Sequence, residues 1–332
     1  MNRPSPIRVL AGDIGGTKTR LAIIDVDGTR LQTVAEETYA SQDHASLRAI
    51  VQAFIGRHAH PVAAACFGIA GPVRDNVAQA TNLPWHIDAA ELEARFPIGR
   101  VFLLNDLEAN AWGIPTLGDG DIFELHAGRA NPRGNAAIIA AGTGLGEAGM
   151  YFDGVRHRPF ASEGGHADFS PNSDQEIELL RFLKQRHRHV SWERVVSGPG
   201  LVNIHDFLRH TAHCQAPDWL AEAMREGDPA AAISRAAQAG RDAVCEEALE
   251  LFIHLYGVEA GNLALKQMAI GGLYIGGGIA PKILDGLKNG AFMNAFLAKG
   301  RMQPLLEQMP VRIILNDRTA LFGPALYAST NT

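Results

Sequence analysis

The chain contains two glycine-threonine loops in matching surroundings, and this repeat restricts the possible folds more than any other feature. Asp13-Ile14-Gly15-Gly16-Thr17 follows the mainly apolar residues 8–12, and Ala141-Gly142-Thr143-Gly144-Leu145-Gly146 follows the apolar residues 136–140. Each loop precedes a second apolar stretch that ends in Asp-Gly, ten residues after the threonine, at Asp27 and Asp153. Since Asp-Gly is a hairpin-turn signal, each copy predicts a strand, a glycine loop, a second strand and a turn.

A tight glycine loop can bind an anion through its backbone, because consecutive N–H groups converge where no side chain intervenes, and a threonine hydroxyl adds a donor. A single loop of this kind is more often an ordinary turn, but duplication with matched spacing favours two phosphate sites that hold a polyphosphate. Neither loop has the Gly-Lys-Ser/Thr of a Walker P-loop. A strand rather than a helix is expected after the second loop, which disfavours a dinucleotide-binding dehydrogenase.

Bulk composition excludes several classes of protein. The chain has 332 residues, 46% of them apolar, which is enough for two domains, and its net charge of -6 gives no indication of nucleic-acid binding. Cys66, Cys214 and Cys245 lie far apart, without the spacing of a zinc or disulfide framework. With no room for a signal peptide before the first strand and no long uncharged apolar segment, we expect a cytoplasmic protein that does not cross a membrane.

Strand and helix signals alternate in the first third of the chain, which is typical of an α/β fold. Strands are predicted at residues 8–12, 20–26, 64–70 and 101–104, and helices at 45–59 and 88–95. The second part repeats the strand, loop, strand order and is more helical. Helices are predicted there at residues 174–188, 197–211, 218–225 and 230–268, strands at 272–275 and 311–315, and a closing helix at 317–330.

Asn105 and Asp106 end the apolar strand Val101-Phe102-Leu103-Leu104 and precede a helix-like segment. Open α/β sheets bind their ligands at the carboxyl ends of strands, so these polar groups are candidates for a site. Asp106 is the right chemical type to accept a proton from an attacking hydroxyl. The alternative is that Asp106 only caps the following helix.

Glu163 and His166 lie three residues apart on a glycine turn, Ser162-Glu163-Gly164-Gly165-His166. They lack a nearby third ligand, so zinc is disfavoured. A carboxylate and an imidazole can instead pair with neighbouring sugar hydroxyls, which need both donors and acceptors. Glu193 is a weaker candidate, because an ion pair with Arg194 would also explain it.

Gly276, Gly277 and Gly278 follow the last apolar strand of the central region. Three consecutive glycines permit close approach of another group to the backbone, such as a base or a ribose. A flexible turn is the alternative.

Together these motifs resemble the sugar kinases of the actin, hexokinase and Hsp70 superfamily, and specifically the bacterial glucokinase family, nearly from end to end. The more specific motifs are Gly68-Ile69-Ala70-Gly71-Pro72-Val73, Thr81-Asn82-Leu83-Pro84-Trp85, Glu163-Gly164-Gly165-His166 and Glu193-Arg194-Val195-Val196-Ser197-Gly198-Pro199-Gly200-Leu201. One departure is Lys18-Thr19-Arg20, where the family usually has Asn-Ala-Arg. This is closer to the related repressor and sugar-kinase group, whose Cys-x-Cys motif is not seen here.

The resemblance implies an α/β, two-domain ribonuclease-H-like or actin-like ATPase fold with an interdomain cleft. The smaller domain would comprise residues 1–112 and 315–332, and the larger one residues 113–314. The implied activity is ATP-dependent phosphorylation of D-glucose at its 6-hydroxyl, the entry step of glycolysis. Alternatives are a kinase for fructose or N-acetylmannosamine, a sugar-binding regulator without turnover, and a chaperone-type or filament-forming ATPase.

The family also implies roles for individual residues. Asp106 would be the catalytic base, and the sugar would be bound by Asn105, Glu163, His166, Glu193, Asn82 and Gly71. Asp13 would hold Mg²⁺ through water. The phosphates and adenosine of ATP would be bound by Gly15, Gly16, Thr17, Gly142, Thr143, Gly144, Gly276, Gly277 and Gly278. A homodimer, with glucose and ATP as ligands, is expected.

Overall fold

The computed structural model describes residues 6–80 and 83–332 and divides the chain into two compact units. The first unit comprises Met1–Ile122, Arg158–Ala161 and Asn316–Thr332, and the second comprises Phe123–His157 and Ser162–Leu315. The domain boundaries expected from the resemblance, at 112/113 and 314/315, stay a prediction.

The first unit is built on a five-stranded sheet with the order β3-β2-β1-β4-β8. Its strands are β1 (Ile7–Ile14), β2 (Lys18–Asp27), β3 (Arg30–Ala40), β4 (Val62–Ile69) and β8 (Ile98–Asn105). β1 pairs antiparallel with β2 and parallel with β4, which in turn pairs parallel with β8. A small antiparallel sheet contains β5 (Val73–Arg74), β6 (Val77–Gln79) and β7 (His86–Asp88).

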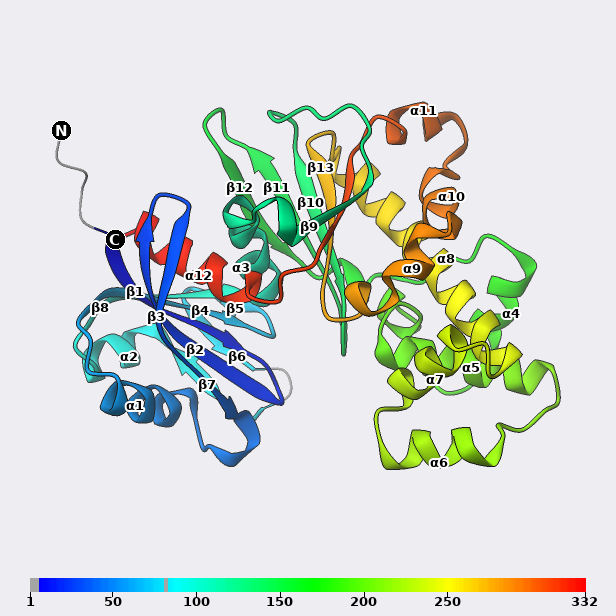
Figure 1. Cartoon of the computed structure of the whole chain (residues 1–332), viewed down its shortest axis with the longest axis horizontal. Helices are drawn as coiled ribbons and strands as arrows, with labels where there is room; N and C mark the ends of the chain where they lie inside the picture. The colour runs from blue at the N-terminus through cyan, green and yellow to red at the C-terminus, as the bar shows by residue number, and fades with distance from the viewer. Residues whose placement is uncertain (1–5, 81–82) are drawn as a thin grey trace. The chain divides into compact units, whose positions relative to one another are not determined.

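Apolar side chains cover both faces of this five-stranded sheet. One core contains Ile50 and Phe54 of α1 (Leu47–Arg57) and Leu92 of α2 (Ala89–Arg95). The other core includes Trp112 of α3 (Asp106–Gly113) and Leu321 of α12 (Thr319–Thr330). The helices α3 and α12 lie beside each other (Figure 1). The carboxyl-terminal helix therefore completes the core of the first unit.

The second unit contains a six-stranded sheet with the order β12-β11-β10-β13-β14-β9. Its strands are β9 (Ile122–His126), β10 (Ala136–Ala141), β11 (Leu145–Phe152), β12 (His157–Ser162), β13 (Gly272–Gly276) and β14 (Val311–Ile314). β10 pairs antiparallel with β11 and parallel with β13, which pairs parallel with β14.

A long buried helix, α8 (Ala243–Gln267), lies at the centre of the helical part of this unit, in contact with α5, α7, α10 and β10 (Figure 1). The other helices are α4 (Asp174–Lys184), α5 (Gly198–Thr211), α6 (Asp218–Glu226), α7 (Pro229–Gln238), α9 (Leu284–Lys288), α10 (Ala291–Leu297) and α11 (Gln303–Leu306). Together with the sheet they enclose one continuous apolar core.

The repeated loop is confirmed as part of a repeated topology. In both sheets an antiparallel hairpin carries the glycine loop, and the first strand of that hairpin pairs parallel with a later strand. The structure also has turns at the two predicted Asp-Gly positions, where Gly28 has φ 63° and Gly154 has φ 97°. Glycine is favoured at both turns because other residues rarely adopt this conformation.

The single helix predicted at residues 230–268 is wrong. The structure has two helices, α7 and α8, separated by a turn in which Gly240 has φ 62° and Asp242 caps α8 by accepting a hydrogen bond from the Cys245 N–H at 2.9 Å. An apolar periodicity that continues across such a turn conceals the break. The strands β3, β9 and β12 and the short helices α9 to α11 were not predicted.

None of the helices in the described part of the chain is both long enough and apolar enough to span a bilayer.

We predict that Gly323→Ala destabilises the first unit. A Cβ atom at Gly323 of α12 would lie 1.7 Å from the carbonyl oxygen of Ala109 on α3, so the two helices would have to separate. We expect the free energy of unfolding in urea to fall by roughly 2 kcal/mol or more. Gly56→Ala in α1 is the control, because its Cβ would meet nothing within 4 Å. Equal stability of the two variants would contradict this packing.

Candidate functional site

The candidate residues of the first unit lie at one edge of its sheet. In the parallel pairings, Asp13 on β1 is opposite Gly68 on β4, and Ile69 on β4 is opposite Asn105 on β8. The carboxyl ends of these three strands are therefore in register. This is the edge at which open α/β sheets bind ligands.

Asn105, rather than Asp106, is the N-cap of α3. Its Oδ1 accepts a hydrogen bond from the Leu107 N–H at 3.0 Å, and its Nδ2 donates to the carbonyl of Gly71 at 3.3 Å. Asp106 is the first residue of the helix and is half-buried, and its Oδ1 also accepts from the Leu107 N–H, at 2.9 Å. Asn105 thus fixes the end of β8 and connects it to Gly71.

The first glycine loop is closed by its own backbone and held by a serine. The Gly15 N–H donates to the carbonyl of Lys18 at 3.0 Å. Ser41, directly after β3, donates its hydroxyl to the Gly15 carbonyl at 2.8 Å and its N–H to the Thr17 carbonyl at 3.0 Å. Two bonds from one residue hold the loop conformation. Sequence reasoning missed Ser41, which belongs to no recognisable motif.

Asp13 is the first residue of this loop, and ionisation of its carboxyl is unfavourable there. Burial raises the pKa of the Asp13 carboxyl, the Arg20 guanidinium lowers it, and the carboxylate of Asp317 raises it. A cation near this carboxyl would offset both the desolvation and the repulsion.

The second glycine loop is tied to the sugar-site candidates of its own unit. The Gly142 N–H donates to the Gly144 carbonyl at 2.8 Å, and the Gly142 carbonyl accepts from the N–H of Gly198, the first residue of α5, at 2.8 Å. At the other end of the loop, the Leu145 N–H donates to Glu193 Oε2 at 3.1 Å. Glu193 is therefore bound to the loop backbone, in place of the surface ion pair with Arg194 considered above.

The three consecutive glycines pack against the same loop. Gly277 has φ 81°, and a Cβ there would lie 2.4 Å from the carbonyl oxygen of Ala141. The Ile279 N–H donates to that carbonyl at 3.3 Å. The close approach at Gly277 is thus made by protein backbone, which places Gly276–278 beside the Gly142-Thr143-Gly144 loop.

Glu163 and His166 lie on a single exposed turn. His166 Nε2 is 3.9 Å from Glu163 Oε2, and both side chains are 59% exposed. Between them, Gly165 is buried against β11, where a Cβ would lie 2.0 Å from the carbonyl oxygen of Leu145. Within the described residues, no group of three or more His, Cys, Asp or Glu side chains is arranged to hold a metal ion.

Backbone bonds and a ring contact join this turn to the segment that carries Glu193. The Trp192 N–H donates to the Ala167 carbonyl at 3.0 Å, and the Phe169 N–H donates to the Val190 carbonyl at 3.0 Å. The rings of Phe169 and Trp192 are buried edge to face, with centroids 5.1 Å apart. The second unit therefore brings Glu163, His166, Glu193 and its glycine loop into one connected cluster.

Asn82, the remaining candidate, lies outside the described residues.

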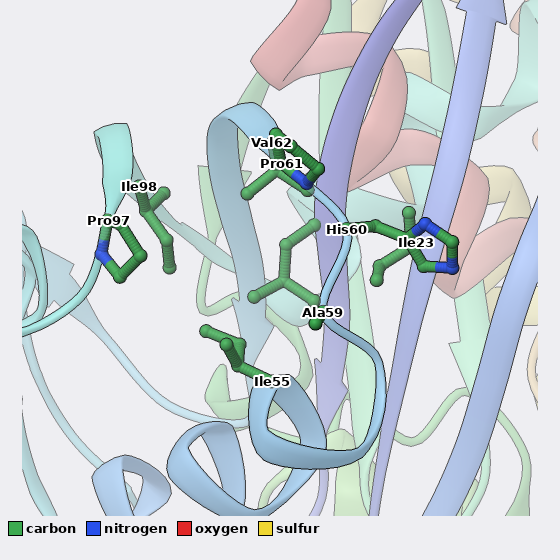
Figure 2. A pocket seen from close by; sticks show the side chains of 9 residues that line it. Ile23, Ile55, Ala59, His60, Pro61, Val62, Pro97 and Ile98 are labelled. Atoms are coloured by element: carbon green, nitrogen blue, oxygen red, sulfur yellow. The ribbon is translucent and has the colours of Figure 1, made fainter.

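A cavity of about 300 Å³ in the first unit is not this site. It is apolar and lined by Ile55, Val62 and Ile98 among others (Figure 2). Val62 and Ile98 begin β4 and β8, so the cavity lies at the amino ends of the strands, whereas Asn105 ends β8.

Comparison with known proteins gives the family. A family model described as Glucokinase matches residues 10–331. The glucokinase of Nostoc punctiforme is 46% identical over 336 residues, covering 97% of this chain and 98% of that protein. The crystal structure of a glucokinase from an Antarctic psychrotroph superimposes with a TM-score of 0.85 at 32% identity, covering 98% of this chain and 99% of the other.

More distant relatives share the fold. A ROK family glucokinase from Streptomyces griseus, solved in complex with glucose and AMPPNP, has a TM-score of 0.67 at 22% identity, covering 98% of this chain and all of that one. The predicted two-domain actin-like ATPase fold is confirmed by these neighbours. The comparisons do not favour a kinase for another hexose or a non-catalytic regulator. The chain therefore belongs to the glucokinase family, enzymes that phosphorylate glucose with ATP as the phosphoryl donor.

Proposed function

We propose that this chain transfers the γ-phosphoryl group of ATP to the 6-hydroxyl of glucose, with Asp106 as the general base. The observation that carries this assignment is the position of Asp106, directly after Asn105 at the carboxyl end of β8 and at the same sheet edge as Asp13. The transition state of phosphoryl transfer is loose, so alignment contributes more than deprotonation. Asp106 orients the hydroxyl and takes its proton late in the transfer.

The remaining sugar hydroxyls are assigned to Asn105, Glu163, His166 and Glu193, with Gly71 lining the site. Glu163 and His166 are exposed and 3.9 Å apart, and they offer an acceptor and a donor on one turn. The amide nitrogen of Asn105 carries two protons, one of which goes to Gly71. Asn82 is retained in this set on the family resemblance.

The phosphates of ATP are assigned to the two glycine loops, through Gly15, Gly16 and Thr17 and through Gly142, Thr143 and Gly144, with Gly276–278 next to the adenosine. Backbone N–H groups in such loops favour anions without requiring a positive net charge. This agrees with the net charge of -6.

Mg²⁺ is assigned to Asp13 through water. The half-buried carboxyl of Asp13, whose pKa is raised by burial and by Asp317, suits a cation. Mg²⁺ keeps several waters and takes substrate phosphates as ligands, so it needs only one or two carboxylates. The ion would neutralise charge on the transferring phosphoryl group. The guanidinium of Arg20, which is paired with Asp13 across β1 and β2, lowers the pKa of this carboxyl and so opposes the effect of burial.

The wider setting is proposed on the same basis. A kinase that makes glucose 6-phosphate supplies the first intermediate of glycolysis, and its donor ATP is found in the cytoplasm, where we place the protein. We also propose a homodimer, as the family resemblance implies.

A coupled assay across a panel of hexoses is the first test. We expect phosphorylation of glucose with ATP and much slower turnover of fructose and N-acetylmannosamine, because polar groups that lose their water when the sugar binds discriminate against a misplaced hydroxyl. Polyphosphate is included as an alternative donor. Absence of phosphorylation of every sugar would refute the proposed function.

We predict that Asp106→Asn lowers kcat by roughly 10²–10⁴-fold, the range for loss of a general base. Asparagine keeps the oxygen that accepts from the Leu107 N–H, so α3 and the thermal stability should be preserved. The measurements are kcat, glucose affinity and Tm. Asp119→Asn, an exposed change in the same unit, is the matched control. Near-normal turnover in the Asp106 variant would exclude this residue as the base.

We predict that Gly165→Ala weakens glucose binding. The new Cβ would lie 2.0 Å from the Leu145 carbonyl oxygen, so the turn carrying Glu163 and His166 must move away from β11. A displacement of about 1 Å can cost on the order of 10²-fold in activity. We expect at least about a tenfold rise in the KM for glucose, measured with ATP saturating. Gly56→Ala is the control, and an unchanged KM would show that the turn does not position these side chains.

A further inference from the structure

A buried carboxyl lies directly beneath the turn that carries Glu163 and His166. Glu147, on β11, is only 1% exposed. Its Oε2 lies where the side chain of Gly164 would begin, since a Cβ at Gly164 would be 1.9 Å from this oxygen. The Glu147 side chain therefore fills the space under the turn, and the turn rests against it.

Glu147 faces a second buried carboxyl. Glu259 on α8 is fully buried, and the two carboxyl groups are within hydrogen-bonding reach of each other. Among the described residues, Glu147 Oε1 has no hydrogen-bond partner. Two ionised carboxylates are both acceptors and cannot bond to each other, but one proton between them turns this buried contact into a hydrogen bond.

The other contacts of the pair indicate which group carries the proton. Glu259 accepts from Asn262 Nδ2 at 2.8 Å and from Lys266 Nζ at 3.4 Å, and both contacts favour its ionised form. Glu147 has neither contact. Burial and the neighbouring Glu259 charge raise the pKa of Glu147 to about 8. Burial raises the pKa of Glu259 as well, so the pair holds one proton, and the two contacts of Glu259 favour Glu147 as the group that carries it.

We propose that Glu147 is a positioning residue for glucose: its proton, shared with Glu259, holds the Gly164–His166 turn in the geometry that binds the sugar. The inference rests on the proposed assignment of Glu163 and His166 to glucose. Loss of the proton places two like charges side by side in the core, which favours movement of the Glu147 carboxylate toward solvent. The path to solvent is blocked by the turn, which is displaced.

Several charged and titratable groups surround the pair formed by Glu147 and Glu259. From α8 these are, besides Glu259 itself, Lys266 and Tyr256; burial raises the pKa of the Tyr256 hydroxyl. Lys299 donates to Asn262 Oδ1 at 2.8 Å and lies near Glu259. The turn carries Glu163 and His166, and β12 carries His157 and Arg158, whereas β10 has no titratable residue.

The test is the pH dependence of the KM for glucose in Glu147→Gln. Glutamine is neutral at every pH and can still donate to Glu259. In the unmodified chain we expect KM to rise above about pH 8, approaching about tenfold per pH unit if binding requires one proton, while kcat changes much less. In Glu147→Gln we expect this rise to disappear. Glu250→Gln, an exposed change on α8, should behave like the unmodified chain.

An infrared spectrum gives a second readout that is independent of turnover. At neutral pH the unmodified chain should show the stretching band of a protonated carboxyl group. This band should be lost from the spectrum of Glu147→Gln and kept in the spectrum of Glu250→Gln. An identical pH profile of KM in Glu147→Gln and the unmodified chain would overturn the proposal. Failure of the glucose assignment would instead appear as unchanged glucose affinity in Glu163→Gln and His166→Ala.

Discussion

Parallel pairing next to an antiparallel hairpin is the constraint on which both candidate regions depend. When β1 forms a hairpin with β2 and also pairs parallel with β4, the hairpin loop and the carboxyl end of β4 must lie at the same edge. The same argument applies to β10, β11 and β13. Polar residues that follow these strands therefore gather at a ligand-binding edge. The chain uses this arrangement twice, which explains why two glycine loops with equal spacing occur in one sequence.

Contacts that involve the backbone hold much of the candidate cluster of the second unit in place. The Leu145 carbonyl lies against Gly165, the Ala141 carbonyl lies against Gly277, and the Leu145 N–H is bound to Glu193. Backbone atoms cannot adjust as the end of a flexible side chain can. The glycine loop, the Glu163 turn and the Glu193 segment are therefore directly connected to one another. A displacement of the residues assigned to glucose would therefore be expected to reach the loop assigned to phosphate without a separate linking element.

The sequence predicts those parts of the fold whose signals are local. Apolar runs bounded by glycine turns identify the hairpins that carry the loops, and the polar ending of β8 identifies Asn105 and Asp106. The strand β3 escaped prediction because only one of its residues, Tyr39, is buried, so its sequence carries many polar residues. The interval between α7 and α8 was missed because it is only four residues long. Ser41 and the partner of Glu147 depend on contacts between distant parts of the chain, which no local pattern reports.

The buried carboxyl pair has a consequence for stability as well as for binding. An acid whose pKa is higher in the folded chain than in the unfolded chain binds more protons when folded, so its contribution to stability is complete below the ordinary glutamate pKa and is lost as pH rises toward about 8. The slope can reach about 1.4 kcal/mol per pH unit for one proton. Well-packed apolar residues at Glu147 and Glu259 would avoid this loss. Because Glu147 lies against Gly164, the proton that stabilises the second unit also helps to hold the turn assigned to glucose. Fold stability and sugar affinity are therefore expected to fall together in alkaline solution.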